Sequence, residues 1–172
     1  ILAPQPNMKN LIDKILIRKN NLENISEKIK YLSNTPQLKK IFDSINSYSE
    51  TSEIRLVGGC VRKILNNEEV DDIDLATNLE PNEVSEVLMK NQIDYYETGI
   101  KHGTITAIID DKKFEITSLR EDVLTDGRHA QIKFSKDWRN DALRRDFTIN
   151  SIYSDREGNI FDPFNGKEDL EK

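Results

Sequence analysis

The sequence predicts an α/β fold of the α+β type, in which a small mixed sheet is flanked by helices. Three observations lead to this prediction. Short apolar runs with strand-like alternation are concentrated after residue 53, amphipathic runs with helical spacing lie between them, and the two types do not alternate strictly along the chain. The length of 172 residues leaves room for one domain, or for one domain with an appendage.

The first fifty residues are expected to form a helical extension. Residues 8–50 are rich in Lys, Asn and Glu, and the clearest helix begins with Thr35 as N-cap and Pro36 as its first residue. Its apolar face consists of Leu38, Ile41, Phe42 and Ile45. Residues 1–7, which precede Met8, are interpreted as a leader, an expression remnant or an upstream extension. We therefore expect an extension over 1–50 and the main domain over 51–172.

The main domain begins with alternating strands and helices. The expected elements are strands over 54–57, 72–77 and 93–98, helices over 60–65 and 81–90, and a hairpin of 104–109 with 113–119. Asp110 and Asp111 are expected at the hairpin turn. Residues 120–134 are polar and contain Asp126-Gly127, so we expect a long loop there. A helix over 137–145 and a hairpin of 149–154 with 159–162 complete the domain.

Composition limits the class of protein. The net charge of −6 argues against a general nucleic-acid-binding surface, although it allows a small acidic metal site with a local basic rim. The single cysteine, Cys60, cannot form an internal disulfide and is expected to be a small buried residue. Without a secretory signal or a membrane-spanning apolar run, the protein is expected inside the cell, in the cytoplasm or an organelle matrix, with no membrane partner. The sequence gives no oligomeric state.

A pair of aspartates carries the clearest chemical signal. If residues 72–77 form a strand, Asp72 and Asp74 lie on one face, because side chains alternate along a strand. Such carboxylates repel each other unless they bind a cation, and Mg²⁺ prefers carboxylate and phosphate oxygens. Glu115, between the apolar Phe114 and Ile116, is the best candidate for a third carboxylate. A solvated strand edge is the simpler alternative for all three.

Gly58 and Gly59 follow the first strand of the domain. Glycine lets the backbone approach phosphate oxygens closely, and Arg62 in the next helix adds a cation. A packing turn would explain the glycines alone. The combination of a Gly pair and an Asp-x-Asp pair, each beside an apolar strand, favours a metal-dependent nucleotidyltransferase.

The run LVGGCVRKILNNEEVDDIDLATN (56–78) resembles the signature of the DNA polymerase beta nucleotidyltransferase superfamily, and within it the class II CCA-adding enzyme and poly(A) polymerase family. The segments KHGTITAII (101–109), FEITSLRED (114–122), RRDFTINSIYSD (144–155) and NIFDPFNGKEDL (159–170) resemble later motifs of this family in the same order.

The resemblance implies roles for individual residues. Asp72 and Asp74 correspond to the metal-binding pair, Glu115 to the third catalytic acid, and Gly59 and Arg62 to triphosphate contacts. Nucleotide contacts are also implied for Arg120, Arg144, Arg145 and Asp146. Residues 123–134 resemble the family's flexible loop. Lys63 departs from the pattern, because the family usually has Asp there, and the family's base-reading motif is expected beyond residue 172, so the chain is expected to be a fragment or a stand-alone head.

The resemblance implies transfer of CMP and AMP from CTP and ATP to the 3′-OH of tRNA with Mg²⁺, which builds or repairs the CCA end. A poly(A) polymerase, or an enzyme that adds only CC or only A, is the alternative within the family. A nucleotide- or RNA-binding module without catalysis is the alternative from another class; Lys63 favours it, whereas the three carboxylates argue against it.

Overall fold

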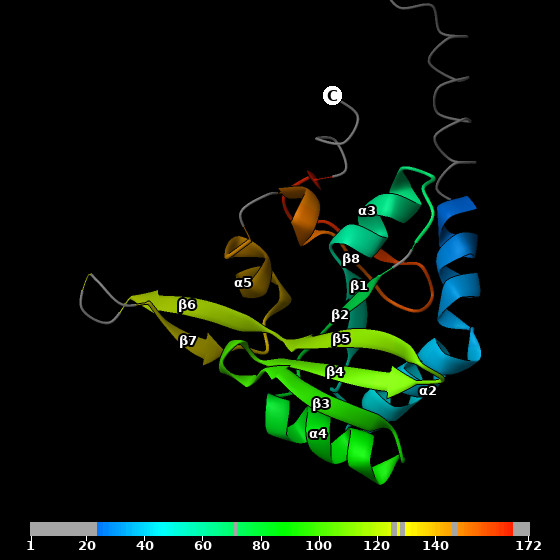
Figure 1. The fold of residues 1–172 in the computed structure, drawn as a ribbon. Coiled ribbons are helices and arrows are strands. Elements are labelled where there is room, and N and C mark those ends of the chain that lie inside the picture. The colour runs from blue at the N-terminus through cyan, green and yellow to red at the C-terminus, as the bar shows by residue number, and fades with distance from the viewer. Residues whose placement is uncertain (1–23, 71, 125–126, 128–129, 146–147, 167–172) are drawn as a thin grey trace, which may run out of the picture.

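A mixed sheet of seven strands forms the centre of the computed structural model, with helices packed around it (Figure 1). The structure describes residues 24–70, 72–124, 127, 130–145 and 148–166. Within them the elements are a helical stretch over 24–33, α2 (Pro36–Asn46), β1 (Ile54–Val57), α3 (Gly59–Leu65), β2 (Ile73–Thr77), α4 (Pro81–Lys90), β3 (Asp94–Gly99), β4 (Thr104–Ile109), β5 (Lys112–Ser118), β6 (Arg120–Leu124), β7 (Ala130–Phe134), α5 (Trp138–Leu143), β8 (Tyr153–Ser154) and β9 (Ile160–Phe161), with 3₁₀ turns at Ile100–His102 and Thr148–Ser151.

The strand order of the sheet is β3-β4-β5-β2-β1-β8-β9. β2 and β5 run parallel, and the other neighbouring strands are antiparallel. The turn between β4 and β5 contains Asp110 and Asp111 with φ of 50° and 61°, as a tight hairpin requires. The predicted mixed sheet with flanking helices is therefore confirmed.

The segment before β1 shares the core of the sheet. All four apolar residues predicted for one face of α2 are fully buried, and Ile29 of the preceding helical stretch joins them in a cluster with Leu56, Leu75 and Ile116. Polar contacts add to this attachment: the Ser26 hydroxyl donates to the Gly158 carbonyl at 3.1 Å, and Arg156 pairs with Asp43 at 2.6 Å. The domain boundary at residue 51 stays a prediction, and residues 1–7 lie outside the described residues.

The prediction of a long loop over 120–134 is wrong. Two strands, β6 and β7, pair antiparallel from Arg120 opposite Phe134 to Leu124 opposite Ala130, and project from the main sheet (Figure 1). Polar residues on both faces of this hairpin, among them Asp122 and Lys133, hide the alternation that identifies half-buried strands. The expected helix over 137–145 also ends earlier, at Leu143, and Asp137 is its N-cap.

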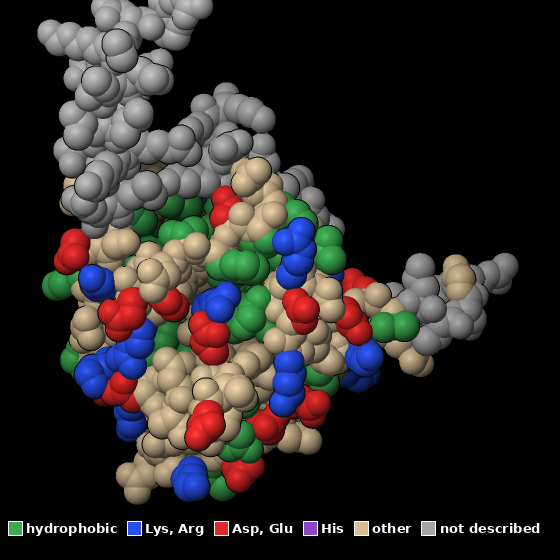
Figure 2. All heavy atoms as spheres, turned by 180° about the vertical axis from the view of Figure 1, so that it is seen from behind, with side chains coloured by type: hydrophobic (Ala, Val, Ile, Leu, Met, Phe, Trp, Pro, Cys, Tyr) green, Lys and Arg blue, Asp and Glu red, His purple; other side chains and the backbone are tan. Residues whose placement is uncertain are grey.

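Acidic and basic side chains are interspersed over the face of the molecule in Figure 2. This face of the described chain shows no broad basic patch, in keeping with the net charge of −6. None of the helices in the described part of the chain combines the length and the apolar character that crossing a bilayer requires.

Candidate active site

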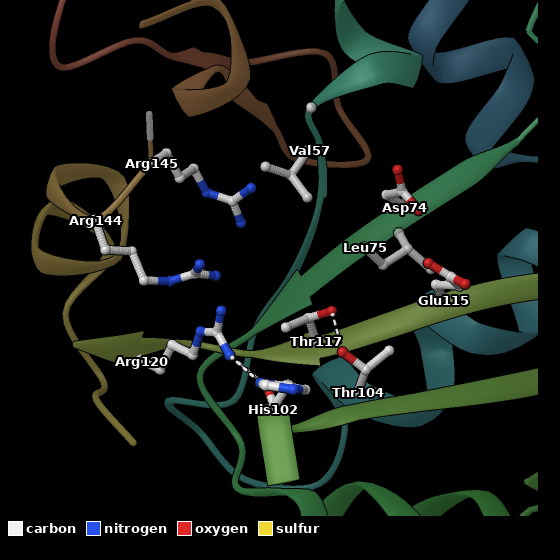
Figure 3. A pocket seen from close by; sticks show the side chains of 11 residues that line it. Val57, Asp74, Leu75, His102, Thr104, Glu115, Thr117, Arg120, Arg144 and Arg145 are labelled. Carbon is white, nitrogen blue, oxygen red and sulfur yellow. Dashed lines mark hydrogen bonds between the residues drawn. The ribbon is translucent and has the colours of Figure 1, made fainter. Parts of the chain in front are cut away.

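A pocket of about 250 Å³ lies where the parallel strands β2 and β5 meet the segment after α5 (Figure 3). It is lined by Val57, Gly58, Asp74, Leu75, His102, Thr104, Glu115, Thr117, Arg120, Arg144 and Arg145. Figure 3 shows the two carboxylates on one side and the three guanidinium groups on the other. The pocket is therefore divided into an acidic side and a basic side.

The acidic side is built by two adjacent strands. Asp74 of β2 and Glu115 of β5 are direct partners in the parallel register. Phe114 and Ile116, which flank Glu115, are buried at 3% and 1% exposure, whereas Glu115 is exposed. The predicted alternation along this strand is confirmed, and it turns the Glu115 carboxylate to the pocket rather than to the core.

Asp74 lies in an environment that disfavours its charge. Partial burial raises the pKa of its carboxyl, and the charge of Glu115, a hydrogen bond with Glu115 and the charge of Asp72 raise it further. Asp72 lies just before β2, is exposed, and does not line the pocket. Its negative charge nevertheless acts on Asp74.

These oxygen donors fit a divalent cation by their chemistry, because a cation would relieve the repulsion that raises the pKa of Asp74. Across the described residues, however, His, Cys, Asp and Glu side chains do not come together in threes as a group arranged to hold a metal ion. Asp74 and Glu115 are therefore the observed pair, and the assignment of Asp72 to the same metal site stays a prediction.

Three arginines form the basic side. Arg120 opens β6, and Arg144 and Arg145 follow α5. Burial and the nearby charge of Arg144 lower the pKa of Arg120. The Nη1 atom of Arg120 also donates to the His102 carbonyl at 3.2 Å. An excess of positive charge gathered in a pocket is suited to binding a polyanion.

The predicted Gly pair is divided between pocket and helix. Gly58 lines the pocket and has a φ of 69°, a backbone conformation that residues with a side chain rarely adopt. Gly59 begins α3. A Cβ added at either glycine would meet no atom within 4 Å, so the space beside them is open to a ligand. Gly59 and Arg62 do not line the pocket, and their predicted triphosphate contacts are untested. Asp146 lies outside the described residues.

Two threonine side chains line the pocket between its acidic and basic sides. The side-chain oxygens of Thr104 and Thr117 lie 3.1 Å apart, next to His102. His102 ends a 3₁₀ turn and also lines the pocket. Cys60 is buried, as expected, and burial raises the pKa of its thiol to about 11.

Asp141 and Tyr153 support the basic side and were missed by sequence reasoning. Asp141 is fully buried and pairs with both Arg144 and Arg145, and the Tyr153 hydroxyl donates to it at 2.6 Å. The spacing of Asp141 from the two arginines, three and four residues, is the signal that would have suggested the pairing. Its burial has no counterpart in the sequence pattern.

The family described as the poly(A) polymerase head domain matches residues 54–172. The mitochondrial CCA tRNA nucleotidyltransferase 1 of Homo sapiens is 49% identical over 122 residues, which cover 70% of this chain and 28% of that protein. The CCA-adding enzyme of Lactobacillus johnsonii is 41% identical over 122 residues, covering 70% of this chain and 30% of that protein. This chain thus spans less than a third of the length of these relatives.

Solved structures of proteins with these activities are also similar to this chain. A CCA-adding enzyme of Bacillus stearothermophilus in complex with CTP matches with a TM-score of 0.66 and 29% identity, covering 80% of this chain and 32% of that one. A tRNA nucleotidyltransferase complexed with a primer tRNA and an incoming ATP analog matches with a TM-score of 0.55 and 26% identity, covering 71% and 34%.

Proposed function

This chain belongs to the poly(A) polymerase head domain family, and from that membership we propose that it is the catalytic head of an enzyme that adds CMP and AMP to the 3′ end of tRNA. The observation that carries the proposal is the divided pocket, with Asp74 and Glu115 opposite Arg120, Arg144 and Arg145. The CCA-adding names of relatives and the CTP and tRNA complexes of similar structures support the choice of substrates.

In the proposed reaction, the 3′-hydroxyl oxygen of tRNA bonds to the α-phosphorus of CTP or ATP. The bond from that phosphorus to the bridging oxygen breaks, pyrophosphate leaves with that oxygen, and the proton of the 3′-hydroxyl group passes to solvent water. Asp72 and Asp74 would hold Mg²⁺ with Glu115 beside them; when bound, Mg²⁺ supplies positive charge that neutralises the reacting phosphates. Glu115 orients the 3′-hydroxyl group, and the three arginines bind the triphosphate and stabilise the charge of departing pyrophosphate.

The remaining assigned residues belong to the same proposal. Gly58 and Gly59 give the triphosphate close access to the backbone, Arg62 adds a cation near it, and Asp146 contacts the nucleotide. The site of action is the cytoplasm or an organelle matrix; the mitochondrial names of the human, mouse and zebrafish relatives support the organelle.

Incubation of the chain, and of the longest native form that contains it, with Mg²⁺, tRNA lacking CCA and each nucleoside triphosphate tests the proposal. Sequencing of the 3′ ends should show C, C and A added in order by the longest form. Asp72→Ala and Asp74→Ala should abolish addition while the fold is kept. Near-normal addition by either variant would remove that aspartate from the catalytic assignment.

Poly(A) addition is the second candidate, and the family description favours it. The charged side chains of the pocket are carboxylates and guanidinium groups, which suit a metal ion and phosphates rather than a base. The 172-residue chain is therefore expected to bind nucleoside triphosphates with little preference among bases. Runs of A on an RNA without a CCA requirement would identify a poly(A) polymerase. Strong preference of the isolated chain for CTP and ATP over GTP and UTP would place base recognition inside the head.

A further inference from the structure

Asp141 has no role in the reaction proposed above, yet it is a charged side chain with no exposed surface. It lies on α5, one turn before Arg144 and Arg145. Burial of an unpaired carboxylate is strongly unfavourable, so the contacts of Asp141 must compensate for it.

Both oxygens of Asp141 are bound by groups that hold the basic side of the pocket. Its Oδ1 atom accepts from the backbone nitrogen of Arg120 at 3.1 Å and from Nε of Arg144 at 3.0 Å. Its Oδ2 atom accepts from Nε and Nη2 of Arg145, at 3.3 and 3.2 Å. One carboxylate therefore contacts all three arginines, two through their side chains and one through its backbone.

Tyr153 completes this network from the sheet. Its hydroxyl donates to Oδ2 of Asp141 at 2.6 Å and accepts from Nε of Arg145 at 3.1 Å. Tyr153 is itself fully buried on β8, with its ring edge-on to Trp138. The network thus links α5 to the central sheet, whose β2 strand carries Asp74.

The charges of the network are unequal. Three guanidinium groups lie on the same side of the pocket (Figure 3). Asp141 supplies one negative charge against them. The like charges repel, so they stay together only if something fixes them. The excess of positive charge then remains available to a ligand with several negative charges.

We propose that Asp141 is a positioning residue, which fixes Arg120, Arg144 and Arg145 in the arrangement that binds the polyphosphate of the incoming nucleotide. The assignment of that polyphosphate as ligand rests on the function proposed above. Asp141 touches no substrate in this proposal, and Tyr153 acts only by holding the Asp141 carboxylate.

Calorimetric titration of the 172-residue chain with inorganic tripolyphosphate in EDTA tests the arrangement without any transfer reaction. Asp141→Asn keeps the shape of the side chain and removes its charge, and Tyr153→Phe removes the hydroxyl alone. Asp137→Asn is the matched control, because Asp137 lies on the same helix but caps its backbone nitrogens, a role that Asn performs equally well. Circular dichroism shows which variants fold.

The direction of the change distinguishes positioning from neutralisation. If Asp141 only offsets positive charge, Asp141→Asn should bind tripolyphosphate more tightly. If it positions the arginines, Asp141→Asn should bind about tenfold more weakly, Tyr153→Phe should be weakened less, and Asp137→Asn should match the wild type. Unchanged or tighter binding by folded Asp141→Asn overturns the proposal, as does unchanged binding by Tyr153→Phe if Asp141→Asn does not fold.

The outcome stays separate from the proposed function. A wild-type chain that binds tripolyphosphate with this pattern but belongs to a protein that adds no nucleotide would leave the positioning role standing and remove the transferase assignment. Absence of tripolyphosphate binding to the wild type would overturn the positioning role, whatever activity the longer protein has.

Discussion

Asp74 and Glu115 are direct neighbours across the parallel strands β2 and β5. The two carboxylates line one pocket, and burial together with Glu115 raises the pKa of Asp74 above its ordinary value of 3.8. A parallel pair places side chains from sequence-distant strands at equal height on one face of the sheet. The sequence separation of these residues therefore hides a like-charge contact, and a divalent cation would relieve its repulsion.

Asp74→Asn is expected to raise the melting temperature in EDTA at pH 7.5, by about 2 °C once solvent screening is considered. A carboxyl whose folded-state pKa is raised favours folding when protonated, and this contribution is lost as pH rises from about 3.8 through the folded pKa. At pH 7.5 the Asp74 carboxyl of the wild type is charged and this stabilising contribution is lost, whereas the amide of Asp74→Asn is neutral at every pH. Calorimetric melting measures the difference.

Two further measurements sharpen this prediction. Mg²⁺ should raise the melting temperature of the wild type more than that of Asp74→Asn, because it is expected to bind the carboxylate pair. Asp94→Asn is the control, since Asp94 is an exposed aspartate on β3 outside the pocket. A lower melting temperature for Asp74→Asn in EDTA would contradict the repulsion.

Glu115→Gln is expected to lower kcat for nucleotide addition by about 100-fold or more, while the Kd for the nucleoside triphosphate changes by less than about threefold. The amide keeps the size of the side chain, but it cannot orient the 3′-hydroxyl as a charged acceptor. Single-turnover kinetics and equilibrium binding separate the two effects. Glu97→Gln, at an exposed strand glutamate, should leave both unchanged, and equal losses at the two positions would exclude a specific role for Glu115.

Local signals explain which parts of the fold could be predicted. The bounds of α4 match the expected 81–90, and α2 begins at the expected Pro36, because both helices have proline at the first position. The hairpin β6–β7 was missed because its strands lie outside the main sheet and lack a consistently buried face. The sequence Asp126-Gly127 is common in loops, but it also favours a hairpin turn.

The site could be predicted only where chemistry follows from a short motif. The strand alternation predicted that Glu115 faces away from the buried Phe114 and Ile116, and the family resemblance supplied its assignment to the site. The role of Asp141 depends on partners from β6, α5 and β8, which only the folded chain brings together. The spacing of Asp141 from Arg144 and Arg145 is visible in the sequence, whereas its burial and its contacts with Arg120 and Tyr153 are not.

Cys60 is expected to resist modification by thiol reagents at pH 8 in the folded protein. The thiolate is the reactive form, and burial raises the pKa of Cys60 to about 11, compared with about 8.5 for a free cysteine. The thiol also donates to the Val57 carbonyl at 3.3 Å. Ellman's reagent should report one thiol in about 8 M urea, which unfolds the chain, and almost none in buffer. Rapid labelling of the folded chain would show that α3 opens readily.

Gly158 joins the β8–β9 turn to the helical stretch over 24–33, and its replacement tests whether that stretch is part of the domain's stability. Gly158 has a φ of 80°, and a Cβ there would lie 2.7 Å from the Cα of Ser26, too close to be accommodated without a backbone shift. Gly127 is the matched control, with a φ of 73° and nothing within 4 Å of its added Cβ.

Both Gly158→Ala and Gly127→Ala are expected to lose about 1 kcal/mol of unfolding free energy, because a left-handed backbone disfavours a side chain. Gly158→Ala should lose about 2 kcal/mol more, because Ser26 and its helix must move away from the turn. Urea unfolding measures both losses, and hydrogen exchange should show reduced protection of residues 24–33 in Gly158→Ala alone. Equal losses in the two variants, with protection unchanged, would mean that the helical stretch yields to the added methyl group at little cost and contributes little to the stability of the head.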